Sequence, residues 1–112
     1  MKTRWHVSKN GDAITLYLTY PPRFDFSAVT VLPRGHPLRL AHQIRQDLWR
    51  ALRHVRGFSP VIRLDPISLG WSVTAGGRIM GKVAPTILER AETVLGDEKN
   101  RARWLKFAGL RS

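Results

Sequence analysis

Two stretches of the chain alternate apolar and polar residues one by one, and this period of two is the strongest constraint on its fold. Side chains along a β-strand point to opposite faces in turn, so each stretch predicts a strand with one face in a core and the other in water. Such strands are typical of antiparallel sheets. The apolar members are Ile14, Leu16, Leu18 and Tyr20 in the first stretch, and Ile67, Leu69, Trp71, Val73 and Ala75 in the second.

Turn signals place further strands around the first stretch. Lys9–Asp12 contains Asn-Gly, a strong hairpin signal because both residues tolerate positive φ. Residues 4–8 are therefore expected to pair with residues 13–20. Pro21-Pro22 ends the second of these strands, since proline lacks the N–H that a ladder needs. Residues 24–32 are ambiguous, and their alternation suggests a short third strand.

The second half of the chain predicts a β-meander. Residues 61–64 form a short apolar strand, and Asp65-Pro66 is expected to turn into the alternating stretch at residues 67–75. Gly76-Gly77 then predicts a hairpin turn that leads into a weak strand through residues 79–83.

Three helices are predicted from apolar residues that recur every three or four positions. The first covers residues 38–55, with Ala41, Ile44, Leu48, Leu52 and Val55 on one face. The second begins at Pro85 and ends at Gly96, and the third is capped by Asp97 and ends at Gly109.

This order of elements predicts an α+β fold: a β-hairpin, a helix, a β-meander and two C-terminal helices. We expect an antiparallel sheet of about four to six strands with the helices packed on one face. The chain has 112 residues, of which 43% are hydrophobic, and no linker divides it, so residues 1–112 are expected to form a single domain. Neither a signal peptide nor a membrane span is evident, so a soluble cytoplasmic protein is expected.

The charge of the chain predicts an anionic partner. Lys and Arg number 19 against 8 Asp and Glu, which gives a formal net charge of +11. Such a charge creates a long-range field that attracts polyanions. Absence of cysteine excludes disulfides, Cys-ligated zinc, iron–sulfur clusters and thiol nucleophiles.

The first helix is the leading candidate for the binding surface, because arginines form a broad stripe on its outer side with one aromatic residue among them. Arginines suit phosphates, and an exposed tryptophan can stack on an unpaired base. The alternative is a solvated outer face, with the tryptophan at the edge of the core. A second basic group lies near the C-terminus, and both groups are expected on one side of the domain. The candidate residues are Arg39, Arg45, Trp49, Arg50, Arg53 and Arg56, with Arg101, Arg103 and Lys106.

Catalytic and metal-binding signals are weak. Gly76–Lys82 has the Gly-x-x-x-x-Gly-Lys spacing of a phosphate-binding loop, but Val83 follows where the motif needs Ser or Thr. His42 and His54 lie about 120° apart on a helical wheel and share no ligand face. No nucleophile motif is present. We therefore predict no catalytic residues, no metal and no cofactor.

Two functions remain open at this point. The first is a non-enzymatic nucleic-acid-binding or nucleic-acid-associated protein that contacts phosphates of DNA or RNA without sequence-specific readout. The second is a protein-interaction module, an adaptor or inhibitor that docks on an acidic protein surface. In that case Phe24 and Phe26 are candidate docking residues, although we favour the alternative that they fill one end of the sheet, since large aromatic residues are usually found in cores.

Overall fold

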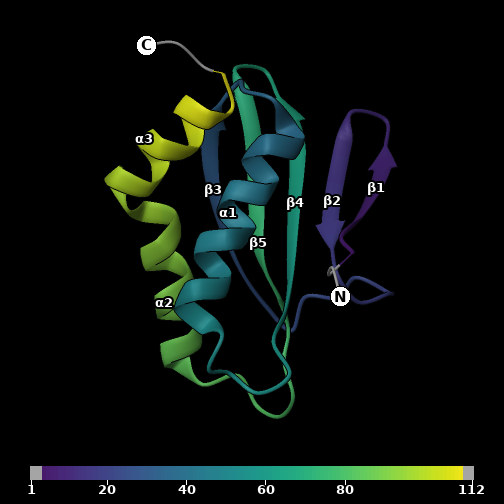
Figure 1. Ribbon diagram of the computed structural model, residues 1–112, viewed down its shortest axis with the longest axis vertical. Helices are drawn as coiled ribbons and strands as arrows, with labels where there is room; N and C mark the ends of the chain where they lie inside the picture. Colours follow the sequence, from purple (N-terminus) through teal and green to yellow (C-terminus); the bar gives the residue numbers. More distant parts are fainter. Residues whose placement is uncertain (1–3, 110–112) are drawn as a thin grey trace.

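A computed structural model describes residues 4–109, which form five strands and three helices (Figure 1). The α+β fold predicted from the sequence is confirmed. In chain order the elements are β1 (His6–Asn10), β2 (Ala13–Tyr17), β3 (Phe26–Pro33), α1 (Pro37–Leu52), β4 (Ser59–Ile67), β5 (Gly70–Arg78), α2 (Pro85–Gly96) and α3 (Glu98–Phe107).

The strands form one sheet in the order β1-β2-β4-β5-β3, and every neighbouring pair is antiparallel. β2 and β3 follow one another in the chain but lie three places apart in the sheet. β3 and β4 are parallel, with β5 between them, and α1 connects the two. The segment from β3 to β4 is therefore a split β–α–β unit, to which the β1–β2 hairpin adds two strands on the β4 side.

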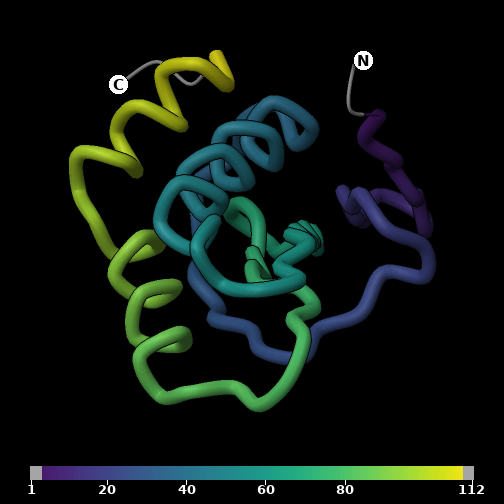
Figure 2. The backbone as a smooth tube through the Cα atoms, turned by 60° about the horizontal axis from the view of Figure 1, so that its bottom comes forward, coloured from purple at the N-terminus to yellow at the C-terminus, as the bar shows by residue number. Residues whose placement is uncertain are grey.

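All three helices pack on the same face of the sheet (Figures 1 and 2). The apolar stripe of α1 faces the inward side chains of β2, β4 and β5, and α2 lies against β3. Full burial of one large apolar side chain contributes about 1.5–3 kcal/mol, so this layer of contacts drives folding. The fully buried core includes Leu16, Leu32, Leu40, Ile44, Leu48, Leu52, Ile62, Leu64, Val73 and Trp104.

The N-terminal hairpin is the thinly covered part of the sheet. β1 pairs with β2 alone, and all five of its residues are exposed. Figure 2 shows the hairpin, in purple and blue, lying beyond α1 and apart from α2 and α3. The side of β1 that faces α1 is therefore open along its length.

The β4–β5 region differs from the expectation at both of its turns. The turn falls at residues 68–69, between the paired Ile67 and Gly70, so Asp65-Pro66 lies within β4. Gly76-Gly77 lies inside β5 and not in a turn, and residues 79–83 form no strand. Close strand approach explains the glycines: a Cβ on Gly76 would sit 2.0 Å from a carbonyl oxygen of β3, and one on Gly77 would sit 2.1 Å from a carbonyl oxygen of β4.

Other boundaries shift by a few residues. The ambiguous third strand is the full-length β3, β2 ends at Tyr17, and α1 ends at Leu52 instead of Val55. The two C-terminal helices begin where predicted, with Pro85 in the first turn of α2 and the Asp97 side chain accepting from the backbone N–H of Asn100 at 2.9 Å. Within residues 4–109, no helix combines the length and the apolar character that a membrane span requires.

Candidate nucleic-acid interface

The outer side of α1 carries a ridge of exposed polar residues. With 3.6 residues per turn, the positions opposite the buried stripe follow one another along the helix. Arg39, Gln46, Arg50 and Arg53 take these positions and are all exposed. Arg56 follows the helix and is also exposed. Three of the ridge residues are therefore cations that point into solvent.

A slot opens beside this ridge, between α1 and the N-terminal segment. It has a volume of about 340 Å³ and is lined by Trp5, Leu18, Arg45, Trp49 and Pro60. The Arg45 guanidinium lies over the Trp5 ring, 4.6 Å from its centroid. Trp49 is 42% exposed, and its inner face stacks on Phe58 with ring centroids 5.9 Å apart. The slot thus has aromatic rings on two sides and a cation between them.

The charge of Arg45 has no acidic counterpart in the described part of the chain, where no Asp or Glu forms an ion pair with it. Its Nη2 lies 3.2 Å from Nδ1 of His42, and its Nε is buried without a hydrogen-bond partner within residues 4–109. Burial lowers the pKa of Arg45. Burial, together with the nearby charge of Arg45, also lowers the pKa of His42, which favours the neutral imidazole as hydrogen-bond acceptor.

Trp5 is the member of the slot that sequence reasoning missed. The β1–β2 register pairs His6 with Tyr17, which brings the preceding residue, Trp5, level with Leu18. Alternation along the strand then turns Trp5 to the side that faces α1. The signal in the sequence was the alternation of Trp5 and Val7 with polar residues, but the partner of that face depends on where α1 lies.

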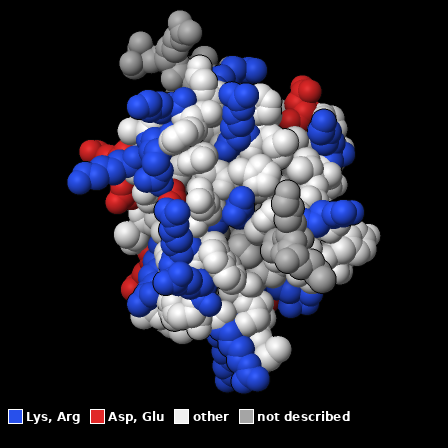
Figure 3. Space-filling view, in the orientation of Figure 1, with Lys and Arg blue, Asp and Glu red and all other residues white. Residues whose placement is uncertain are grey.

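Basic residues also gather at the C-terminal end of α1. Arg53 and Arg56 are joined there by Arg90 from α2, which the sequence did not single out. The Nη1 of Arg90 lies 3.3 Å from Nε2 of His54 and donates to the carbonyl oxygen of Ala51 at 3.5 Å. The negative end of the helix dipole favours cations at this place. Figure 3 shows Lys and Arg side chains spread over this face of the molecule, including the lower ends of the helices, with acidic side chains at the left edge and at the upper right.

Two of the candidate arginines in α3 hold the fold together and do not face a ligand. Arg101 donates to the hydroxyl of Thr30 at 2.7 Å and to the carbonyl oxygens of Val31 at 2.6 Å and Leu95 at 2.9 Å. Arg103 donates to the carboxylate of Asp47. The physical reason is that the Arg101 side chain reaches acceptors on β3 and the Arg103 side chain reaches an acceptor on α1.

Asp47 is the acid of α1, and its charge is largely neutralised within the molecule. Its Oδ2 accepts from the indole N–H of Trp104 at 2.6 Å as well as from Arg103, while Arg50 lies 3.8 Å from Oδ1. Lys106 remains exposed on α3, which packs beside α1 in the same helical layer. Both basic groups therefore lie in one layer, but of the three candidate side chains on α3 only that of Lys106 is without a hydrogen bond or ion pair to the rest of residues 4–109.

The predicted docking residues divide between core and surface. Phe26 is 6% exposed and packs on Phe58 with ring centroids 5.8 Å apart, so it is a core residue and not a docking residue. It points inward because it begins β3 on the face covered by helices. Phe24 precedes the strand and is half-buried.

The remaining sequence motif is structural. The Gly-x-x-x-x-Gly-Lys segment begins inside β5, so its first glycines form part of the sheet and no phosphate-binding loop is present there. In the part of the chain that the structure describes, no three His, Asp or Glu side chains gather as metal ligands. No family model, no curated protein and no solved structure matches this chain.

Proposed function

We propose that this protein binds nucleic acid through α1, with the arginine ridge on the phosphates and the slot around a base. The observation that carries the proposal is the half-buried Arg45, whose charge meets a neutral histidine and a tryptophan face and no acid within residues 4–109. A desolvated cation without a counter-ion is costly, and an anionic ligand would remove that cost.

The composition of the slot favours a nucleotide over a carboxylate on a protein surface. A base is a flat ring linked to an anion, so it can stack on Trp49 or Trp5 while its phosphate meets an arginine. An acidic protein surface offers the anion without the ring. The exposed half of Trp49 would then remain uncovered.

The ridge supports phosphate contacts along a strand. Arg39, Arg50 and Arg53 are exposed on one side of α1, and Arg56 is exposed in the turn that follows the helix. Phosphate contacts fix position and carry no sequence information. We therefore expect binding that depends on chain charge and base stacking, with no strong base preference.

The proposal is tested by titrating fluorescently labelled single-stranded DNA and RNA with the full chain at 50 and 200 mM salt. For four phosphate contacts we expect affinity to fall by about fifty-fold between these salt concentrations. Absence of binding at low salt, or affinity indifferent to salt, would overturn the proposal. The DNA and RNA arms decide which of the two is preferred.

Substitutions at two exposed aromatic residues distinguish the contribution of base stacking to affinity from the contribution of charge. Trp49→Ala is expected to weaken binding by about tenfold with an unchanged salt dependence, because base stacking contributes roughly 1–3 kcal/mol. Phe107→Ala is the control, since Phe107 is 56% exposed on α3 outside the slot. Equal affinities for the two variants would contradict a base in the slot. Binding to polyglutamate that equals binding to nucleic acid, with Trp49→Ala unaffected, would favour the acidic protein partner instead.

A further inference from the structure

We infer that the slot is one end of a longer groove along the inner side of β1, and that this groove takes single-stranded and not duplex nucleic acid. This inference rests on the proposed function and specifies its ligand. Three observations carry it: the register of the hairpin, a second cavity further along β1, and the distribution of charge between the two cavities.

The register places both cavities on the same side of the hairpin. Trp5, Val7 and Lys9 alternate along the N-terminal strand and share its inner side. Val7 pairs with the buried Leu16, and Lys9 pairs with the buried Ile14. Trp5 lines the slot, whereas Val7 and Lys9 line the second cavity. Val7 is 39% exposed, so the floor between the two ends is open to solvent.

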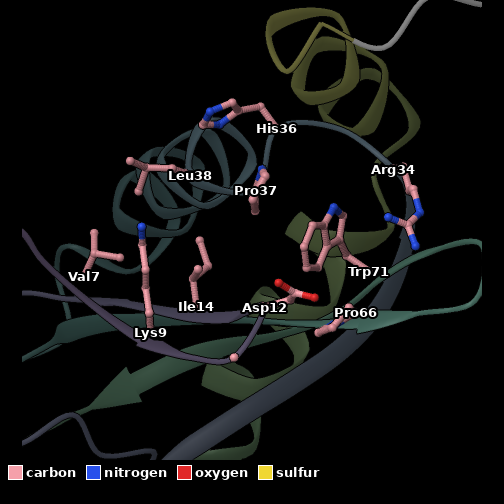
Figure 4. Close-up of a pocket in the computed structure, with 11 residues that line it drawn as sticks. Val7, Lys9, Asp12, Ile14, Arg34, His36, Pro37, Leu38, Pro66 and Trp71 are labelled. Atoms are coloured by element: carbon pink, nitrogen blue, oxygen red, sulfur yellow. The ribbon is translucent and has the colours of Figure 1, made fainter.

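The second cavity, of about 660 Å³, lies between the hairpin and the first turn of α1 (Figure 4). Lys9 extends from β1 toward Leu38 on the helix, and Arg34 lies on the other side of the cavity beyond Trp71. Trp71 is fixed in place, because its indole N–H donates to the carbonyl oxygen of Gly35 at 3.1 Å. A rigid aromatic wall therefore stands between two cations.

α1 contributes to the lining of both cavities, and the loop before α1 together with β4 and β5 completes that of the second. Leu38 belongs to the second cavity, and Arg45 and Trp49 belong to the slot. These residues lie within about 60° of one another on the helical wheel, on the side that faces the hairpin. From Trp5 to Lys9 the floor measures roughly 13 Å at 3.3 Å per strand residue. The groove is therefore longer than one nucleotide.

Charge along the groove suits a polyanion. Arg45 stands at the slot, and Lys9 and Arg34 stand at the far end. Asp12 is the acid that lines the second cavity, so cations outnumber acids in the lining residues of the two cavities.

The recessed position of the aromatic rings selects unpaired bases. Trp5 lies half-buried in the groove between the hairpin and α1, where the paired and stacked bases of a duplex cannot enter. Trp71 is 7% exposed, so it closes the wall of the second cavity and offers little surface for stacking. A duplex can meet only the ridge of α1 through its outer phosphates. A single strand can lay its bases in the groove and its phosphates along the cations.

The test compares thymidine monophosphate, labelled oligothymidylates of two, four and eight nucleotides, and a duplex with the same number of phosphates, all at 50 mM salt. We expect affinity to rise with oligonucleotide length until the groove is filled, and the duplex to bind at least tenfold more weakly than the single strand. Duplex binding as tight as single-strand binding would overturn the groove and leave the proposed function intact. Failure of all nucleic acids to bind would instead overturn the proposed function.

Substitutions at the far end test whether the two cavities act together. Lys9→Glu and Arg34→Glu are each expected to weaken binding of the eight-nucleotide strand roughly tenfold and to leave binding of the monophosphate unchanged. Lys99→Glu is the matched control, since Lys99 is an exposed lysine on α3 away from the groove. If both substitutions at the far end match the control, the groove does not extend beyond the slot.

Discussion

Asp47 shows how one residue changes meaning once the fold is known. In the sequence it is the lone acid on an arginine-rich helix. In the structure its carboxylate joins α1 to α3, through the indole N–H of Trp104 and the guanidinium of Arg103. Its side chain is 11% exposed, so these contacts are formed mostly out of water.

Replacing Asp47 by alanine is expected to destabilise the protein by about 2–3 kcal/mol. The substitution leaves the buried indole N–H of Trp104 without its acceptor and Arg103 without its counter-ion. Urea denaturation measures the loss. Glu92→Ala is the control, because Glu92 is exposed on α2 and is expected to change stability by no more than about 0.5 kcal/mol. A loss for Asp47→Ala as small as that of the control would contradict the role given to this carboxylate.

The lowered pKa of His42 predicts that the folded protein loses stability in mildly acidic solution. Its pKa in the folded protein is lowered by burial and by the charge of Arg45. The unfolded chain therefore binds a proton at this position more readily than the folded chain does. The contribution of neutral His42 to the free energy of unfolding is complete above the ordinary histidine pKa of about 6.5, and it is lost as the pH falls below that value.

The measurement is the free energy of unfolding at pH 7.5 and pH 5 for the unmodified protein and for His42→Gln. Glutamine retains a side-chain acceptor for Arg45 but does not titrate. We expect the variant to lose less stability than the unmodified protein over this interval. Identical losses would show that His42 does not titrate differently in the two states.

At the scale of elements, β5 is the strand on which the sheet depends. It pairs with β3 on one side and β4 on the other over its whole length, and its glycines allow both neighbours to approach closely. This close approach also explains why Gly76-Gly77 is not a turn. A pair of glycines favours turns, but here the two residues must lack side chains so that the neighbouring strands can pack closely.

A matched pair of glycine substitutions tests this role of β5. Gly76→Ala is expected to destabilise the protein by more than about 2 kcal/mol, because its Cβ would lie 2.0 Å from the carbonyl oxygen of Phe26 and the strands must move apart. Gly96→Ala makes the same chemical change at the end of α2, where no atom lies within 4 Å of the new Cβ. Thermal denaturation of both variants is the measurement. Equal midpoints would rule out the close strand approach as the reason for Gly76.

At the scale of the whole molecule, the net charge of +11 has opposite effects on folding and on binding. Like charges repel one another in the compact state, so excess positive charge weakens folding. The same charge strengthens attraction to a polyanion. Internal pairing relieves part of the repulsion, as at Asp25, Asp47 and Asp65, each of which pairs with at least one arginine.

Added salt is therefore expected to move stability and affinity in opposite directions. Between 20 and 200 mM sodium chloride, the free energy of unfolding is expected to rise, because salt screens the repulsion. Affinity for single-stranded nucleic acid is expected to fall steeply over the same range. Urea denaturation and anisotropy titration on one preparation measure both. A parallel fall in both quantities would contradict this account of the charge.

The part of the fold that follows from local periodicity was predicted well. The alternation around Ile14 and around Val73 predicted two strands and the inward faces of their central residues, and the spacing of Ile44, Leu48 and Leu52 predicted the buried face of α1. Tyr20, Ile67 and Leu69 were predicted to face the core but are exposed, because the alternating stretches extend beyond the strands into turns and strand ends. A period of two or of 3.6 residues is a property of neighbouring positions, so it can be read without the fold. The turns at residues 65–66 and 76–77 were predicted wrongly, because strand pairing overrode their local turn preference.

The candidate site was predicted in part. Arg45 and Trp49 were singled out as members of one helix, and their exposure beside the ridge follows from helical geometry. Trp5 and Arg34 were missed, because only the register of the hairpin and the path of the loop before the helix bring them to the two cavities. Arg101 was chosen for its charge, although its hydrogen bond to Val31 spans 70 positions of the chain and no local pattern reveals such a contact.

By itself, the sequence determined the strongly periodic elements, the inward faces at their centres and the strongly positive charge, since these depend on residue type and on spacing along the chain. Only the tertiary structure decided the strand order, the groove between β1 and α1, and which arginines face solvent and which hold the helices together. The reason is that each of these depends on contacts between residues far apart in the chain, where the position of one element determines the surroundings of another.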